Sequence, residues 1–237
     1  MMSGKRWGYV VQFFCLLVFL GMSPFLIKMD GRKTMSVSSD SVRSQNVSDE
    51  VKPVVALTFD DGPNASSTPI LLGGLKERKV RATFFLIGEN VEKDENEKIV
   101  KRMYEEGHLI GNHTYTHCNL SKLETGEAKK ELEQTDTVIE KITGKQPVFV
   151  RAPYGELPVD SEQDLNRIYI GWTVDPLDWM TEDTGAVVKT VVEEINPGDV
   201  ILLHDCYPSS VQAAIRIVDL LQGKGYEFVT VDELLLE

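Results

Sequence analysis

The chain has 237 residues, a formal net charge of −12 and 42% hydrophobic residues. The part that follows residue 51 is long enough for a single domain with a substantial hydrophobic core. Its excess of acidic side chains argues against nucleic acid or an anionic lipid surface as its partner.

The N-terminal segment contains one long hydrophobic run. Residues 7–27 include Gln12 as their only strongly polar residue, and Lys5-Arg6 precede them. A run of this length spans a bilayer as a helix. We therefore expect a transmembrane signal anchor over residues 7–27, with residues 1–6 in the cytoplasm. A cleaved signal peptide, which would release a secreted form, is the alternative, but Pro24 would directly follow the cleavage site.

Residues 28–51 are rich in Ser, Asp and Val and lack hydrophobic periodicity. We expect them to form a flexible linker between the anchor and a folded domain over residues 52–237.

Short apolar runs alternate with helical patterns throughout residues 52–237. This alternation is typical of a parallel sheet with helices outside it, either as an open doubly wound sheet or as a closed barrel. No Gly-x-Gly-x-x-Gly follows the first strand, which disfavours a dinucleotide-binding domain. The predicted strands are 54–59, 82–87, 108–110, 148–151, 168–174, 200–203 and 228–230, and the predicted helices are 68–79, 97–106, 125–142, 184–195 and 209–222.

Five polar clusters each begin where a predicted strand ends. In (β/α) barrels the active site is built at the carboxyl ends of the strands, so this coincidence favours a barrel with its site at that edge. The clusters begin at Asp60-Asp61, His113, Arg151, Asp175 and His204.

The first two clusters contain candidate metal ligands. Adjacent residues at a strand end point in opposite directions, so Asp60 and Asp61 can serve different tasks, although Asp-Gly-Pro is also a common turn sequence. His113 and His117, four residues apart, can reach one point if the segment makes a helical turn. With Asp61 they would give three ligands and leave open positions, the pattern of a catalytic divalent metal. Zn²⁺ is favoured, and Co²⁺ or another divalent ion is the alternative.

The other clusters allow two interpretations each. Arg151 could hold a carboxylate ionised or form a surface salt bridge. Trp179 could be a sugar-stacking platform or a core residue. His204 could be a core histidine, or a general acid if a carboxylate raises its pKa. We expect His108 to be structural.

TFDDGP, HTYTH, RAPYG, DPLDW and ILLHD, in this order, resemble the five motifs of the polysaccharide deacetylases of carbohydrate esterase family 4. The resemblance covers about residues 54–237 and implies an α/β fold, a distorted (β/α) barrel of typically seven repeats with parallel strands and outer helices. By position it implies a general base at Asp60, metal ligands at Asp61, His113 and His117, and a bracing residue at Thr114. It further implies that Arg151 orients Asp60, that the Tyr154 N–H binds the oxyanion, that Asp178 or Asp175 tunes the general acid His204, and that Trp179 and Leu202 shape the acetyl pocket.

The resemblance implies a metal-dependent hydrolase that removes N-acetyl groups from N-acetylglucosamine-type residues of an extracytoplasmic polysaccharide. Peptidoglycan is the favoured substrate and chitin-like oligomers come next. The alternatives are an O-acetyl esterase acting on xylan and a non-catalytic, metal-holding carbohydrate-binding protein. The oligomeric state is not indicated.

Two cysteines directly follow motif residues, Cys118 after His117 and Cys206 after Asp205. If the motifs converge in an exported protein, a Cys118–Cys206 disulfide is our hypothesis, and two buried free thiols are the alternative.

Overall fold

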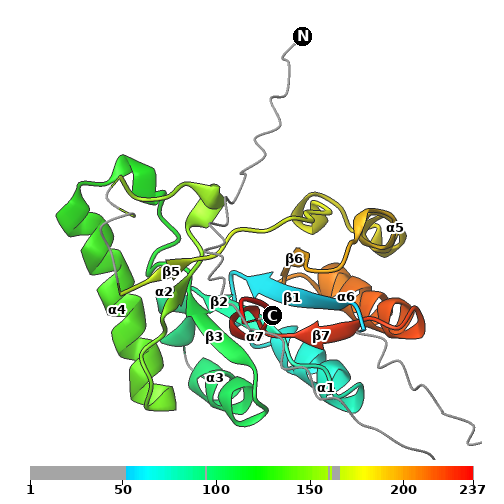
Figure 1. The fold of residues 1–237 in the computed structure, drawn as a ribbon. Helices are drawn as coiled ribbons and strands as arrows, with labels where there is room; N and C mark the ends of the chain where they lie inside the picture. The colour runs from blue at the N-terminus through cyan, green and yellow to red at the C-terminus, as the bar shows by residue number, and fades with distance from the viewer. Residues whose placement is uncertain (1–51, 94, 160, 162–165, 237) are drawn as a thin grey trace, which may run out of the picture. The chain divides into compact units, whose positions relative to one another are not determined.

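The computed structural model describes residues 52–93, 95–159, 161 and 166–236 (Figure 1). The predicted anchor and the whole of the predicted linker lie outside these residues. Among the helices that are described, none has the length and apolar character needed to cross a membrane. By internal contacts the chain divides into Met1–Ser48 and Asp49–Glu237, and every described residue belongs to the second unit.

Within the described residues, seven parallel strands form one sheet, as expected for this α/β class. The order is β5-β4-β3-β2-β1-β6, and β7 pairs with the first half of β1. The strands are β1 (Val54–Asp60), β2 (Thr83–Leu86), β3 (Leu109–Asn112), β4 (Phe149–Val150), β5 (Ile168–Tyr169), β6 (Val200–His204) and β7 (Glu227–Val229).

The predicted strand over residues 168–174 is divided between two edges of the sheet. Its first residues, Ile168–Tyr169, pair with β4. At its other end, Val174 forms a parallel bridge with Ile201 of β6, and the Leu202 N–H donates to the Val174 carbonyl at 2.9 Å. Because β5 and β6 are the two ends of the strand order, this segment curls the sheet into the expected distorted (β/α) barrel, with an irregular seam.

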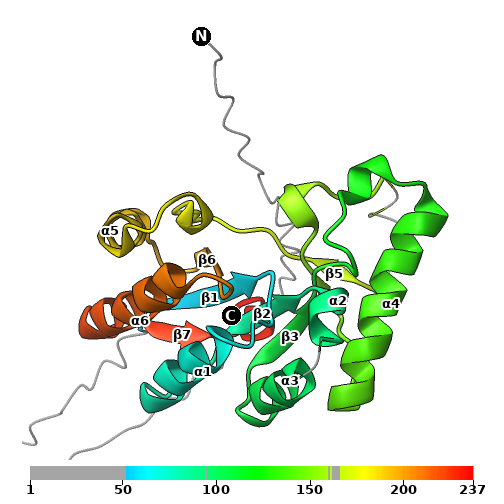
Figure 2. The same ribbon diagram turned by 180° about the vertical axis from the view of Figure 1, so that it is seen from behind.

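Helices surround the curled sheet (Figures 1 and 2). Pro69 and Pro208 occupy the first turns of α1 and α6, where a missing N–H costs nothing. Gly144, left-handed at φ 72°, follows α4 as predicted. The short helices α2 and α7 were not predicted. The helices are α1 (Thr68–Glu77), α2 (Gly88–Val91), α3 (Asn96–Glu105), α4 (Thr125–Thr143), α5 (Thr184–Glu194), α6 (Pro208–Gly223) and α7 (Val231–Leu234), with 3₁₀ turns at Leu120–Lys122, Pro153–Gly155 and Asp178–Met180.

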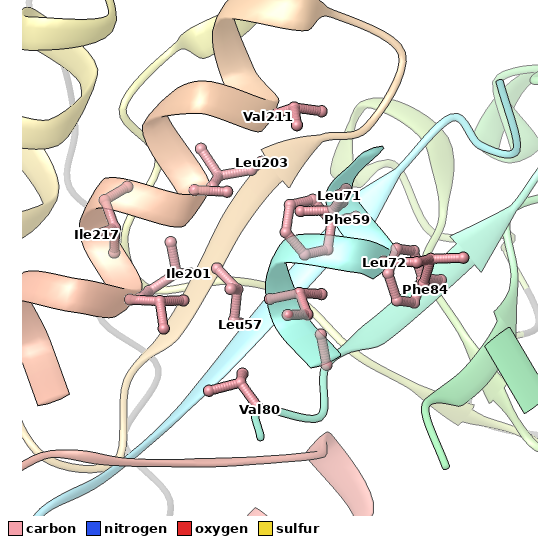
Figure 3. Close-up of a cluster of buried hydrophobic side chains, with 14 of the residues drawn as sticks. Leu57, Phe59, Leu71, Leu72, Val80, Phe84, Ile201, Leu203, Val211 and Ile217 are labelled. Carbon is pink, nitrogen blue, oxygen red and sulfur yellow. The ribbon is translucent and has the colours of Figure 1, made fainter. Parts of the chain in front are cut away.

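The main hydrophobic core lies between the sheet and its outer helices (Figure 3). Alternate residues of β1 and β6 point into it, because successive side chains of a strand face opposite ways. These strand residues pack against side chains of α1 and α6. The buried residues labelled in Figure 3 are Leu57, Phe59, Leu71, Leu72, Val80, Phe84, Ile201, Leu203, Val211 and Ile217.

A smaller cluster of Ala56, Phe85 and Val231 packs apart from the main core. Its Val231 belongs to α7, and the Val231 N–H donates to the Thr83 hydroxyl at 3.1 Å. Thr83 is the first residue of β2, so α7 covers the amino ends of the strands. The carboxyl ends remain for the site.

Candidate active site

The five polar clusters meet at the carboxyl ends of the strands, as predicted. Asp60 ends β1 and His204 ends β6, and the two are register partners on neighbouring hydrogen-bonded strands. His113 follows the last residue of β3, and Arg151 follows β4. The acid, base and metal-ligand candidates therefore lie together at the carboxyl ends of the strands of one sheet.

Asp61, His113 and His117 form a compact cluster of possible metal ligands. The Asp61 Oδ1 atom lies 3.4 Å from His113 Nε2 and 3.3 Å from His117 Nε2. All three ligand atoms lie within 4.8 Å of one another. One carboxylate and two imidazoles are ligands of the kind that bind zinc and similar divalent ions.

The surroundings of these three side chains fit a bound cation. The Asp61 Oδ1 atom is buried and accepts no hydrogen bond. His113 Nδ1 lies 2.7 Å from the Arg151 carbonyl, so an Nδ1–H donated to that oxygen leaves Nε2 free as a ligand. Burial lowers the pKa of His117, which favours the neutral imidazole that a metal requires. Burial opposes ionisation of Asp61, but the two imidazoles outweigh it and lower the pKa of Asp61.

Arg151 is buried and holds Asp60. Its Nη1 group donates to Asp60 Oδ1 at 2.9 Å and to the Thr58 hydroxyl at 2.7 Å. Its Nη2 group donates to the Gly171 carbonyl at 2.9 Å, and its guanidinium stacks 4.3 Å from the Phe85 ring centre. Since its donors are bonded within the protein, Arg151 is not the exposed salt bridge that the sequence left open, and it fixes one carboxylate oxygen of Asp60.

His204 pairs with Asp178. His204 Nδ1 lies 2.7 Å from Asp178 Oδ1, and the His204 backbone N–H donates to Asp178 Oδ2 at 2.8 Å. Burial lowers the pKa of His204, but Asp178, Asp60 and Asp61 outweigh it and raise that pKa to about 9. Asp175 instead accepts from the Leu177 N–H at 2.9 Å, so Asp178 is the partner of the two that the sequence left open.

The remaining predicted residues lie around this centre. The Tyr154 ring packs edge-on against His117, with centroids 4.9 Å apart, and the Tyr154 N–H donates to no backbone carbonyl of the described residues. Trp179 is 51% exposed, so it is not a core residue, whereas Leu202 is buried. Thr114 is buried in the loop between the two histidines, and its N–H donates to Asn112 Oδ1 at 2.8 Å.

Left-handed backbone is concentrated in the motif loops. Among the described residues, six non-glycine residues have positive φ, and five of them belong to the motifs. Such conformations cost free energy and persist only where surrounding contacts impose them. The five are Asp61 (φ 70°), Thr114 (65°), His117 (58°), Tyr154 (62°) and Leu177 (55°).

The disulfide hypothesis was wrong, because Cys118 and Cys206 are both free thiols. Their surroundings differ. Cys118 packs against the small cluster around Leu120 and Leu132, where burial raises the pKa of its thiol. Cys206 lines a cavity of about 440 Å³ beside Asp61, and burial raises the pKa of its thiol to about 12. Adjacency of each cysteine to a motif residue did not indicate which way its side chain would point.

Three residues near the site were missed from the sequence. Asn90 donates to the Asp61 carbonyl at 2.7 Å, and Tyr207 packs edge-on against His204 with ring centroids 6.3 Å apart. Asp205 is fully buried beneath the Asp61 turn. The His-Asp pair in ILLHD was the one signal that could have pointed to Asp205.

The sequence profile of the polysaccharide deacetylase family matches residues 48–170. A peptidoglycan-N-acetylglucosamine deacetylase of Bacillus cereus is 40% identical over 190 residues, which cover 77% of this chain and 68% of that protein. PdaC of Bacillus subtilis, a peptidoglycan-N-acetylmuramic acid deacetylase, is 38% identical over 194 residues, which cover 82% of this chain. The match covers 41% of PdaC, so this chain corresponds to well under half of that protein.

Solved structures agree with these matches. The structure of PdaC is similar with a TM-score of 0.75, covering 78% of this chain and 90% of that one. A family 4 acetyl xylan esterase from Clostridium thermocellum, in complex with a cobalt ion, is 33% identical with a TM-score of 0.73, covering 77% of this chain and 90% of that one.

Proposed function

This chain belongs to the polysaccharide deacetylase family, and we propose that it is a metal-dependent hydrolase that removes N-acetyl groups from N-acetylglucosamine-type residues of a cell-wall or surface polysaccharide. One observation carries the proposal. Asp60 and His204, on neighbouring strands, lie beside the Asp61–His113–His117 cluster. A candidate proton acceptor, a candidate proton donor and three candidate metal ligands therefore meet at the carboxyl ends of the strands.

Asp61, His113 and His117 would hold the divalent ion, with Zn²⁺ favoured and Co²⁺ as an alternative. When bound, the ion would polarise the acetyl carbonyl and lower the pKa of the attacking water. The Oδ1 atom of Asp61 is buried without a hydrogen bond and faces both imidazoles, and the Nδ1 contact of His113 leaves its Nε2 atom available as a ligand, which supports this assignment.

Asp60 acts as the general base. Arg151 occupies one oxygen of this carboxylate at 2.9 Å, which leaves the other oxygen, 3.7 Å from His113 Nε2, oriented toward the metal ligands. That oxygen takes a proton from the water that attacks the carbonyl carbon.

His204 acts as the general acid. With its pKa raised to about 9, it is protonated at neutral pH and can donate a proton to the amide nitrogen as the carbon–nitrogen bond breaks. Acetate and a free amino sugar are the products. The Tyr154 N–H, which donates to no backbone carbonyl in the part of the chain that the structure describes, would stabilise the negative charge that develops on the carbonyl oxygen.

Trp179 and Leu202 would bound the pocket for the acetyl methyl group. Leu202 is buried within β6, and the half-exposed Trp179 belongs to the 3₁₀ turn that also supplies Asp178. An apolar wall here favours a methyl group over water.

Peptidoglycan is the favoured substrate, because the Bacillus cereus relative and PdaC are named for action on peptidoglycan. Such a substrate places the domain outside the cytoplasm. Residues 7–27 would then anchor it to the cell membrane, or be removed to give a secreted form.

Release of acetate by the purified full chain tests the proposal. The protein is stripped with a chelator, reloaded with Zn²⁺ or Co²⁺, and incubated with peptidoglycan, chitopentaose or acetylated xylan. We expect metal-dependent acetate release from the first two substrates. Release from xylan alone would instead indicate an O-acetyl esterase, and no release from any substrate would favour a carbohydrate-binding role.

A further inference from the structure

A buried carboxylate beside the site has no role in the reaction described above. Asp205 follows His204 and is fully inaccessible to solvent. Its Oδ2 atom accepts a hydrogen bond from the Thr68 hydroxyl at 2.6 Å, and its backbone carbonyl accepts one from the Ser67 hydroxyl at 2.5 Å. Both donors lie where the β1–α1 loop enters α1.

This hydrogen bonding extends into the loop that carries Asp61. The Thr68 hydroxyl, which donates to Asp205, also accepts from the Asn64 N–H at 2.9 Å. The Asn64 side chain in turn accepts from the Ser66 N–H at 2.9 Å. One buried carboxylate thus anchors a chain of hydrogen bonds along the loop.

Asp205 also packs directly on the residue after the metal ligand. A Cβ atom added at Gly62 would lie 2.5 Å from Asp205 Oδ2 and 2.6 Å from Oδ1. No side chain fits at that distance, so the carboxylate occupies the space that a larger residue at position 62 would need.

Asp61 needs such support, because its backbone is left-handed at φ 70°. On another side of the turn, Asn90 donates to the Asp61 carbonyl at 2.7 Å and the Ile87 N–H donates to the Gly62 carbonyl at 3.0 Å. The turn is therefore held between the segment that follows β6, which contributes Asp205, and the α2 region.

We propose that Asp205 is a positioning residue that holds the Asp61 turn in its metal-binding conformation. This inference rests on the metal site of the proposed function and adds a determinant of metal affinity that lies outside the ligand set.

Metal affinity tests the inference. Titration calorimetry with Zn²⁺ or Co²⁺ is carried out on the chelator-treated full chain and its variants. Loss of a residue that orients a ligand typically weakens metal binding by about 10- to 100-fold. We expect at least about a tenfold loss in Asp205→Ala. Asp205→Asn keeps the volume and an oxygen acceptor for Thr68, so its dissociation constant should stay within about threefold of the unchanged protein.

Two further variants separate positioning from general stability. Val218→Ala removes buried volume from α6 away from the loop, so it should lower the melting temperature of the metal-free protein but leave metal affinity unchanged. Gly62→Ala should weaken metal binding as Asp205→Ala does, because its Cβ collides with the carboxylate. When Gly62→Ala and Asp205→Ala are combined, the Cβ atom no longer collides with a carboxylate. The loss of metal-binding free energy in this double variant should therefore be smaller than the sum of the losses in the two single variants.

Unchanged metal affinity in Asp205→Ala would overturn the inference, and so would an equal loss of affinity in Val218→Ala. A protein that binds metal but releases no acetate would contradict the proposed function and leave the role of Asp205 standing, since the measurement is binding and not turnover.

Discussion

At the scale of single residues, the two groups proposed to transfer protons have opposite surroundings. The cationic Arg151 contacts Asp60, the proposed proton acceptor. The anionic Asp178 contacts His204, the proposed proton donor, and favours its imidazolium form. Both partners are buried, so little water screens these interactions. Separate single substitutions should therefore distinguish proton transfer, metal binding and pKa tuning.

Asp60→Asn should retain the metal and lose most of its turnover. The substitution keeps the shape of the side chain but removes the proton acceptor, and loss of a general base typically costs about 10²–10⁴-fold in rate. His117→Ala should instead lose the metal itself. Metal content after dialysis, measured together with kcat/KM, separates the two effects. Unchanged turnover in Asp60→Asn would exclude this residue as the base.

Asp178→Asn should move the alkaline limit of activity to lower pH. A general acid works while it is protonated, so activity is present below its pKa and is lost as the pH rises through it. Removing the carboxylate that raises the pKa of His204 lowers that pKa, by about one unit or more. Asp175→Asn is the matched control, because Asp175 accepts from the backbone N–H of Leu177 in its own turn rather than from His204. A pH profile of kcat/KM that is the same in both variants would contradict the assignment of Asp178.

At the scale of strands and helices, the barrel interior supports the site through close packing. Gly111 of β3 is the register partner of Phe85 on β2, and Phe85 stacks under the Arg151 guanidinium. A Cβ atom at Gly111 would lie 2.5 Å from the Phe85 ring. The absence of a side chain at position 111 therefore leaves the space that Phe85 needs beneath Arg151.

Gly111→Ala should destabilise the fold by about 1–3 kcal/mol through overpacking, and it should lower activity by displacing Phe85 and Arg151. Gly73→Ala is the matched control. Gly73 lies within α1 with nothing within 4 Å of an added Cβ atom, so alanine should stabilise the protein by about 0.5–1 kcal/mol. Urea denaturation of both variants measures the difference. A stabilised Gly111→Ala would show that the interior is looser than the contacts indicate.

Strands and motif positions could be predicted from the sequence because each depends on local pattern. Apolar runs ending in polar residues located β1 and β6, and the five motifs located Asp60, Asp61, His113, Arg151 and His204 at one edge. The split of residues 168–174 could not be predicted, because apolar character does not reveal which sheet edge a residue pairs with. The left-handed Asp61 and the buried Asp205 also depend on tertiary contacts, and nothing in their residue types distinguishes them from ordinary turn and surface carboxylates.

At the scale of the whole molecule, the end of the barrel opposite the site contains a pH-sensitive group. His108 directly precedes β3 and is buried, with its Nδ1 accepting from the Ala82 N–H at 3.1 Å and its ring edge-on to Phe84. Burial lowers the pKa of His108 from 6.5 to about 4. The structural role expected for His108 agrees with these contacts, and it makes the fold sensitive to acid.

His108 should reduce stability as the pH falls from about 6.5 toward 4. The unfolded chain binds a proton at His108 below pH 6.5, whereas the folded chain resists protonation until about pH 4. The contribution of neutral, buried His108 to the free energy of unfolding is therefore complete above pH 6.5 and is lost as the pH falls from 6.5 to about 4. The loss at pH 5 is about 2 kcal/mol. Urea denaturation of the metal-free protein should therefore show a smaller loss between pH 7 and pH 5 in His108→Gln than in the unchanged chain. Equal losses would mean that His108 is not the responsible group.

The pairing of Asp60 with His204 across β1 and β6 has a consequence for how members of this family can diverge. The backbone hydrogen bonds between these strands, rather than the surrounding loops, set the separation of these two groups proposed to transfer protons. Insertions and substitutions in the surrounding loops can thus change which polymer is accepted while that separation stays constant. A change of glycan substrate would then leave the relative positions of Asp60 and His204 unchanged.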